Sequence, residues 1–460
     1  MAFPSIDALL DQHQQPHTDD LLEWLRIPSV SSDPHATAEV RAAGQWVADR
    51  LKAAGLTVEW IETQGHPLIY AETPAVPGAP IALVYGHYDV QPAEPLDLWH
   101  TPAFEPDIRD GNVYARGATD DKGQVLTHVQ AVIRLLETGQ PLPLQIKFMI
   151  EGEEEVGSAN LERMLPELAE KLACDVVVIS DSSQFAPGQP AITYGLRGIA
   201  TFELKVDGPR QDLHSGSFGG AVMNPGIALA KLIAAIVDDQ GRIQLPGFYD
   251  DVLPLSDEER AQFAALPHTD QAFAESLGVD QLFGEAGYTA LERKWARPTF
   301  DVNGLTCGHQ GAGVKTIIPA TASAKLSCRL VPNQDPEKIA SALESFIATQ
   351  CPPGVRATVQ RDHGAPGMVA NLNSPFITAA QHALGEAFGK PPVMIREGGS
   401  IPIVQQFQET LGADCLLLGW GLNDDNAHSP NEKFCLADYH RGIKASAYLW
   451  QAIGNLSNSR

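Results

Sequence analysis

Four short apolar runs most strongly constrain the fold of this chain. They cover residues 80–85, 144–150, 175–180 and 415–418. Each is nearly continuous in aliphatic and β-branched residues, as is typical of strands covered on both faces. Amphipathic helical patterns accompany them, for example over 36–54, 125–136 and 158–173. The alternation predicts an α/β fold with a mainly parallel sheet and helices on both faces.

Candidate metal ligands stand where these runs end. His87 follows the first run, Glu155 closes an acidic segment after the second, and Asp181 follows the third. His428 lies in the loop beyond the fourth run, and Asp120 comes just before a strong helical pattern. Because α/β enzymes build their sites at the carboxyl ends of parallel strands, these five side chains are expected to converge at one edge of the sheet.

Each candidate taken singly has an ordinary structural explanation. His87 and His428 could be turn or loop histidines, and Asp120 could be a helix N-cap. Asp181, followed by two serines, could be a turn residue. It is their joint occurrence that favours a functional site.

The acidic segment 151–155 carries four carboxylates in five positions. Such a segment is usually a solvated charge run near a helix start. Here a fully apolar strand leads into it, and mutual repulsion would be costly without a cation. The sequence therefore indicates a metal site.

Two histidines and three carboxylates suffice for two cations if one carboxylate bridges them. A pair of ions polarises a carbonyl and lowers the pKa of a shared water, and a further carboxylate must then accept the proton of that water. Zinc suits a set of histidine and carboxylate ligands, and manganese or cobalt would also fit it. A two-metal hydrolase is the leading hypothesis.

A second domain is expected because 460 residues exceed one ordinary core. The texture changes near residue 199 to strands that alternate between polar and apolar residues, over 201–206, 322–330 and 355–360. Two strand–helix units with one-faced strands predict an α+β sandwich. We therefore expect a discontinuous catalytic domain over 1–198 and 371–460, with a domain over 199–370 inserted in it.

Charge and composition narrow the partners and the location. The formal net charge of -25 would repel nucleic acid and anionic membrane surfaces. No run approaches the roughly 20 apolar residues that span a bilayer, and no secretory signal pattern opens the chain. The six cysteines are scattered without a Cys-x-x-Cys pair, which fits a reducing compartment. A cytoplasmic protein is expected.

Six segments resemble, in order, one family of metallopeptidases. They are GHYDVQP at 86–92, GATDDKG at 117–123, EGEEEVGS at 151–158, YGLRG at 194–198, DLHSG at 212–216 and AHS at 427–429. The family includes carnosine dipeptidases, cytosolic non-specific dipeptidases, carboxypeptidase G, aminoacylases, acetylornithine deacetylase and succinyl-diaminopimelate desuccinylase. The resemblance covers nearly the whole chain, and the chain resembles the dipeptidase branch most of all. It implies a zinc-exopeptidase-like fold.

The resemblance also implies a division of the ligands between two zinc ions. One would be held by His87, Asp120 and Asp181, and the other by Asp120, Glu155 and His428, so that Asp120 bridges. An aspartate at position 181 resembles the aminopeptidase and dipeptidase members, where carboxypeptidases have glutamate.

Two further residues receive roles beside the ligands. Glu154 would be the general base, and Asp89 would orient His87. The run of three glutamates leaves the register open to a slip, and the following Val156-Gly157-Ser158 fixes Glu154 and Glu155 in these roles.

The inserted domain would be a lid that also forms a homodimer. The resemblance implies that His214 reaches the partner's active site and stabilises the oxyanion, although a polar turn would otherwise explain it. Arg329 would grip the terminal carboxylate of the substrate, a task suited to its planar fork, although a solvated arginine is the simpler interpretation. Gly399 and Ser400 would contact the same carboxylate.

The expected protein is a homodimeric di-zinc dipeptidase acting on small peptides. Glu154 would serve as general base for a metal-bridging hydroxide that attacks the peptide carbonyl. The alternative is an N-acyl amino acid deacylase, a deacetylase or desuccinylase, with the same site. A catalytically silent peptide-binding homologue would require a lost ligand or base, and none is missing.

Overall fold

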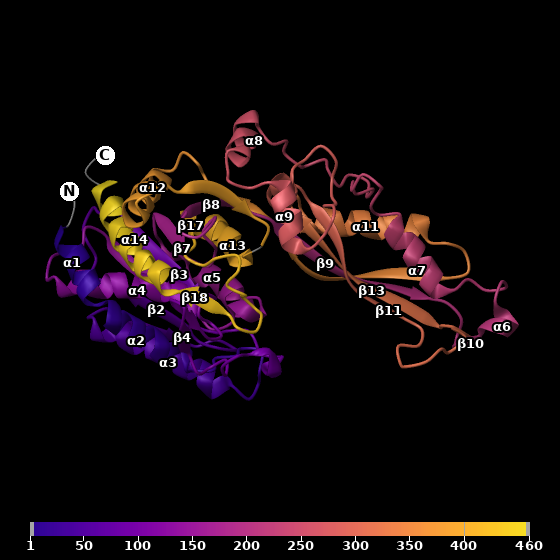
Figure 1. The fold of residues 1–460 in the computed structure, drawn as a ribbon, viewed down its shortest axis with the longest axis horizontal. Coiled ribbons are helices and arrows are strands. Elements are labelled where there is room, and N and C mark those ends of the chain that lie inside the picture. The colour runs from indigo at the N-terminus through magenta and orange to yellow at the C-terminus, as the bar shows by residue number, and fades with distance from the viewer. Residues whose placement is uncertain (1–3, 400, 457–460) are drawn as a thin grey trace. The chain divides into compact units, whose positions relative to one another are not determined.

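The computed structural model describes residues 4–399 and 401–456, which form two compact units (Figure 1). Unit 1 consists of the chain up to Tyr194, Ala370–Ile395 and the chain from Ile403 onward. Unit 2 consists of Gly195–Val369 and Arg396–Pro402. Each unit is described by itself below.

A nine-stranded sheet, counted over the described residues, has most of its strands in unit 1 and the order β1-β2-β6-β3-β7-β17-β8-β15, with β16 paired to β8. The strands are β1 (Thr57–Ile61), β2 (Leu68–Glu72), β3 (Ile81–His87), β6 (Gln145–Glu151), β7 (Val176–Ile179), β8 (Ala191–Leu196), β15 (Met368–Val369), β16 (Val393–Glu397) and β17 (Asp414–Leu418). The four central strands β6, β3, β7 and β17 are mutually parallel. They are the four predicted runs, so the predicted mainly parallel sheet is confirmed.

Helices cover this sheet. They are α1 (Pro4–Gln12), α2 (Gln14–Leu25), α3 (Thr37–Ala53), α4 (Lys122–Glu137), α5 (Ala159–Leu172), α12 (Pro375–Phe388), α13 (Pro402–Leu411) and α14 (Leu436–Gly454). Helix α4 packs on β3, and α14 packs on both α4 and α12, as Figure 1 shows. Every residue of β6 and β7 is buried, as expected for strands covered on both faces. Among the described residues, no helix is long and apolar enough to cross a membrane.

Short elements complete unit 1. A small antiparallel sheet is formed by β4 (Asp107–Arg109), β5 (Asn112–Tyr114) and β18 (Lys433–Cys435). Two 3₁₀ helices cover Leu96–Leu98 and Glu154–Val156. The pairing of β18 with β5 brings the segment after His428 next to the segment before Asp120.

Unit 2 is built on an antiparallel sheet of order β11-β13-β9-β14. Its strands and helices are β9 (Gly198–Asp207), β10 (Leu213–His214), β11 (Thr299–Cys307), β12 (Ile317–Ile318), β13 (Thr321–Leu330), β14 (Arg356–Ala365), α6 (Ser215–Phe218), α7 (Pro225–Ala234), α8 (Asp257–Ala264), α9 (Asp270–Leu277), α10 (Ala290–Ala296) and α11 (Pro336–Gln350). Buried residues of β9 and β13 share a core with α7 and α11. Burial alternates along β9, so one face of the sheet is covered by helices, as an α+β sandwich requires.

Candidate metal centre

The site begins at the carboxyl end of β3, where His87 is fully buried. A Cβ at Gly86 would lie 2.7 Å from an Asp121 carboxylate oxygen and 2.6 Å from a Val125 methyl carbon. Glycine therefore lets the start of α4 approach β3 closely. The amide of His87 donates to Asp121 Oδ2 over 3.2 Å. This contact places the residue just before it, Asp120, beside His87.

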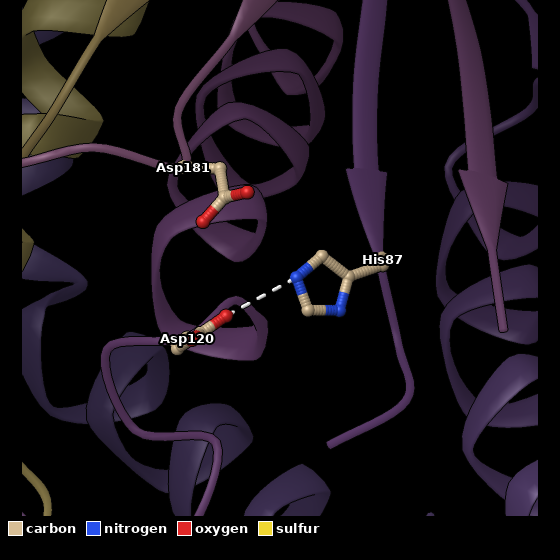
Figure 2. A group of neighbouring side chains, drawn as sticks. All are labelled: His87, Asp120 and Asp181. Atoms are coloured by element: carbon tan, nitrogen blue, oxygen red, sulfur yellow. Dashed lines mark ion pairs between the residues drawn. The ribbon is translucent and has the colours of Figure 1, made fainter. Parts of the chain in front are cut away.

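The first group of ligand atoms comes from His87, Asp120 and Asp181, all within 4.8 Å of one another (Figure 2). Nε2 of His87 lies 3.2 Å from Oδ1 of Asp120, yet it is buried and makes no hydrogen bond to the described residues. A buried ring nitrogen that faces carboxylates without a hydrogen bond fits a metal ligand.

The second group comes from Asp120, Glu155 and His428, again within 4.8 Å. Nε2 of His428 lies 2.9 Å from Oδ2 of Asp120 and 3.3 Å from Oε2 of Glu155. Asp120 thus directs one oxygen toward each histidine. The two groups share this aspartate, and the donor set fits two divalent cations bridged by one carboxylate.

Electrostatics in the cluster agree with that fit. Burial, together with the carboxylates of Asp120 and Glu155, raises the pKa of Glu154 to about 7 against an opposing effect of His87. Burial and the neighbouring carboxylates of Asp120 and Asp121 raise the pKa of Asp181. Hydrogen bonds to Asp120 and Glu155 raise the pKa of His428 to about 10. The cluster therefore requires added positive charge, which protons or metal ions can supply.

Asp89 supports the backbone of Glu154 and Glu155 as well as His87. Nδ1 of His87 forms a hydrogen bond with the backbone oxygen of Asp89 at 3.1 Å and lies 3.4 Å from its buried carboxylate. The two carboxylate oxygens accept the amides of Glu154 at 3.3 Å and Glu155 at 3.2 Å. Asp89 therefore holds a histidine of the first group and the backbone of the two glutamates.

The four carboxylates of segment 151–155 have different surroundings. Glu151 accepts hydrogen bonds from Tyr85 at 2.7 Å and Ser158 at 2.8 Å, and burial raises its pKa to about 8. Glu153 accepts a hydrogen bond from the side-chain amide of Asn160 at 2.6 Å. Of the four, Glu154 and Glu155 lie beside the two candidate ligand groups.

Sequence reasoning missed Glu432, which organises the loop that carries Asp120. This fully buried carboxylate pairs with Arg116 at 2.7 Å. It also accepts the amides of Gly117, Thr119 and Asp120 at 3.0, 2.9 and 3.1 Å. The signal available in the sequence was its position four residues after His428.

The remaining predicted site residues belong to unit 2. His214 is exposed in β10, and its Nδ1 accepts the amide of Gly216 at 3.1 Å as an N-cap. Arg329 is half-buried on β13, and Gly399 is exposed. Ser400 lies outside the described residues.

Two histidine–carboxylate groups that share an aspartate, at the carboxyl edge of a parallel sheet, are typical of a metal-dependent hydrolase. The model of peptidase family M20/M25/M40 matches residues 83–452, and the chain belongs to this family. Membership implies binding of divalent metal.

Named relatives and solved structures refine the comparison. The Beta-Ala-His dipeptidase of Homo sapiens is 33% identical over 97% of this chain and 92% of its own. The structure of human carnosine dipeptidase 1 has a TM-score of 0.85 at 33% identity and 98% coverage of both chains. The structure of the dipeptidase Dug1p of Saccharomyces cerevisiae has a TM-score of 0.85 at 31% identity, also with 98% coverage of both chains. The metallo-carboxypeptidase Sso-CP2 of Sulfolobus solfataricus gives 0.85 at 33% identity, covering 95% of this chain and 99% of its own.

Proposed function

We propose that this chain is a dipeptidase that uses two Zn²⁺ ions to hydrolyse small peptides with a free terminal carboxylate. The observation that carries the proposal is the aspartate shared between two histidine–carboxylate groups, with the unligated Glu154 beside them. The names of the human and yeast relatives support a dipeptide substrate.

Five residues would hold the ions: His87, Asp120 and Asp181 the first, and Asp120, Glu155 and His428 the second. The bound ions would supply Lewis-acid activation of the substrate carbonyl and of water. Mn²⁺ and Co²⁺ accept the same donors, so metal analysis of the purified protein has to identify the ion.

Glu154 would take the proton of the attacking water and pass it to the leaving amine. Its backbone amide donates to Asp89, and neither proposed ion position uses its carboxylate, so this carboxylate is available to accept a proton. Asp89 would act indirectly, by fixing His87 and the segment that carries Glu154.

Replacing Glu154 tests this role. We expect Glu154→Gln to lower kcat by roughly 10²- to 10⁴-fold while two metal ions per chain remain, because general-base catalysis is lost and the ligands are not. The measurements are steady-state kinetics and elemental analysis. Glu153→Gln is the matched control, since Glu153 is bonded to Asn160 and should leave kcat unchanged. Normal turnover by the Glu154 variant would remove the residue from the mechanism.

The substrate class is tested with a panel of dipeptides, longer peptides and N-acetyl or N-succinyl amino acids, before and after chelation. We expect dipeptides to be preferred and activity to return with added zinc. The similarity to the Sulfolobus carboxypeptidase makes preference for longer peptides the second candidate. The deacylase alternative has less support, because relatives that are 32% or 33% identical over at least 95% of the chain are named as peptidases.

Arg329 would bind the terminal carboxylate of the substrate, with Gly399 and Ser400 contributing to the same subsite and His214 to the oxyanion. We expect Arg329→Met to raise KM for a dipeptide by roughly 10- to 100-fold, as for loss of a charge-assisted hydrogen bond. The same substitution should have little effect on a C-terminally amidated substrate. An equal loss with both substrates would contradict the assignment.

A homodimer through unit 2 and a cytoplasmic location are also proposed. Strand β11 is an edge strand with exposed Val302 and Leu305, which suits it to pairing with a second copy. All six cysteines are free, which agrees with a reducing compartment.

A further inference from the structure

The loop over residues 91–100 contacts Glu155 of the second ligand group at one end and Asn431, three residues after His428, at the other. It begins four residues after His87 and includes the 3₁₀ turn Leu96–Leu98. Its hydrogen bonds lie at the second proposed ion position, whereas the first position has other supports.

At the start of the loop, Gln91 holds Glu155. Nε2 of Gln91 donates to Oε2 of Glu155 at 2.8 Å and to its backbone oxygen at 3.3 Å, and the Gln91 amide donates to Oε1 at 3.1 Å. Both carboxylate oxygens are therefore held by one residue. The side chain of Glu155 is 4% exposed, so little water competes for these bonds.

At the end of the loop, Asn431 holds the segment that carries His428. Nδ2 of Asn431 donates to the oxygen of Leu98 at 2.8 Å, and Oδ1 accepts the amide of His100 at 2.8 Å. His428 and Asn431 both have a left-handed backbone, with φ of 60° and 62°. Because few residues favour that conformation, an external tie is needed to fix the histidine.

Further hydrogen bonds support the loop near its two ends, whereas its middle, residues 94–98, is exposed. Arg116, which pairs with Glu432, donates to the oxygen of Pro92 at 3.0 Å, and Trp99 donates to Ala93 within the loop at 2.7 Å. The loop is thus a hydrogen-bonded brace between Glu155 and the His428 segment. The first group has other supports, since His87 is held by Asp89 and Asp121.

We propose that Gln91 and Asn431 are positioning residues that set the affinity of the second ion position, formed by Asp120, Glu155 and His428, while leaving the first unchanged. The inference rests on the proposed function, because it takes these side chains as ligands. Residues that orient ligands in this way typically change metal affinity by about 10- to 100-fold.

The test is zinc binding to the full-length metal-free protein, measured by calorimetry in competition with a chelator. Gln91→Met removes the donor at similar size, and Asn431→Gly removes the amide while accepting the left-handed backbone. His428→Gln identifies which binding event belongs to the second position. Asn160→Ala is the matched control, because its amide bonds Glu153, which is not a proposed ligand.

We expect both variants to weaken the binding event that His428→Gln removes by about 10- to 100-fold, with the other event and the melting temperature of the metal-free protein unchanged. Activity lost at low zinc should return at high zinc. Equal weakening of both events, or a lower melting temperature of the metal-free variants, would overturn the inference in favour of a general structural role.

Two failures are separable. If the wild-type protein binds fewer than two ions, the ligand assignment itself fails. If the wild type binds two ions and Gln91→Met binds both with wild-type affinity, only the role of the brace fails.

Discussion

At the scale of single residues, Asp120 has the most consequential position. It gives one oxygen to each histidine, and its own backbone amide is held by Glu432. Although burial acts in the opposite direction, the adjacent rings of His428 and His87 lower the pKa of Asp120. It is thus ready to act as an anionic bridge.

We expect Asp120→Asn to abolish binding of both metal ions, since an amide is a weak bridging ligand. His428→Gln should remove one ion and leave the other. Elemental analysis after dialysis gives the number of ions per chain. Two retained ions in Asp120→Asn would show that the residue does not bridge.

The sequence predicted the convergence at this scale but not all of its supports. Ligands at strand ends could be found because burial on both faces leaves a recognisable apolar run. The hydrogen bonds of Glu151 and Glu153 could not be predicted, because their donors Tyr85, Ser158 and Asn160 lie outside the acidic segment 151–155. The role of Glu432 was not predicted for the same reason, since its partners lie more than 300 residues away in sequence.

At the scale of elements, the docking of α2 against α4 and α14 depends on an uncharged histidine. Nε2 of His17 accepts from Arg134 of α4 at 3.2 Å, and Tyr439 of α14 donates to the His17 oxygen at 3.0 Å. Burial, together with Arg134, His440 and His13, lowers the pKa of His17 to about 3. A second neutral histidine, His440, lies beside it with a pKa lowered by burial to about 4.

Acid should therefore destabilise this part of unit 1. The folded-state pKa of His17 lies below its unfolded value of 6.5, so the unfolded chain binds the extra proton and stability is lost as pH falls from about 6.5 toward 3. Between pH 7 and pH 5 the loss is about 2 kcal/mol from this residue.

Urea unfolding at the two pH values measures the effect. His17→Gln should lose about 2 kcal/mol less than the wild type over that interval, whereas the exposed His35→Gln should behave like the wild type. Identical pH dependence in wild type and His17→Gln would show that His17 is not the source.

Prediction of elements succeeded where burial was extreme. The four buried runs are the four central strands. Strand β1 was missed because its residues are half-buried or exposed, so it has no continuous apolar run. Helices α8 and α9 were missed within a polar stretch, because they are short and bury few residues. Helix α10 buries most of its residues but is too short to show a helical period. Strand β11 was missed because its exposed edge position allows many polar residues.

At the scale of the whole molecule, the exposed edge of unit 2 predicts how copies associate. Leu305 on β11 is 62% exposed, and an apolar side chain on an unpaired edge strand favours pairing with another strand. We expect Leu305→Asp to convert a dimer into monomers, seen by analytical ultracentrifugation, without loss of folding. Leu253→Asp is the matched control, since Leu253 is 63% exposed in the same unit but lies outside β11. A wild-type monomer, or a dimer in Leu305→Asp, would place the contact elsewhere.

The parallel pairing of β17 with β7 also has a consequence for biosynthesis. A ribosome that has translated as far as β17 has already made His87, Asp120, Glu155 and Asp181, but not His428 or Glu432. Such a nascent chain carries the proposed ligands of the first position, whereas His428 of the second position and the buried carboxylate that shapes the Asp120 loop come later. With two bound ions required, hydrolytic activity is restricted to chains whose synthesis has also passed His428 and Glu432.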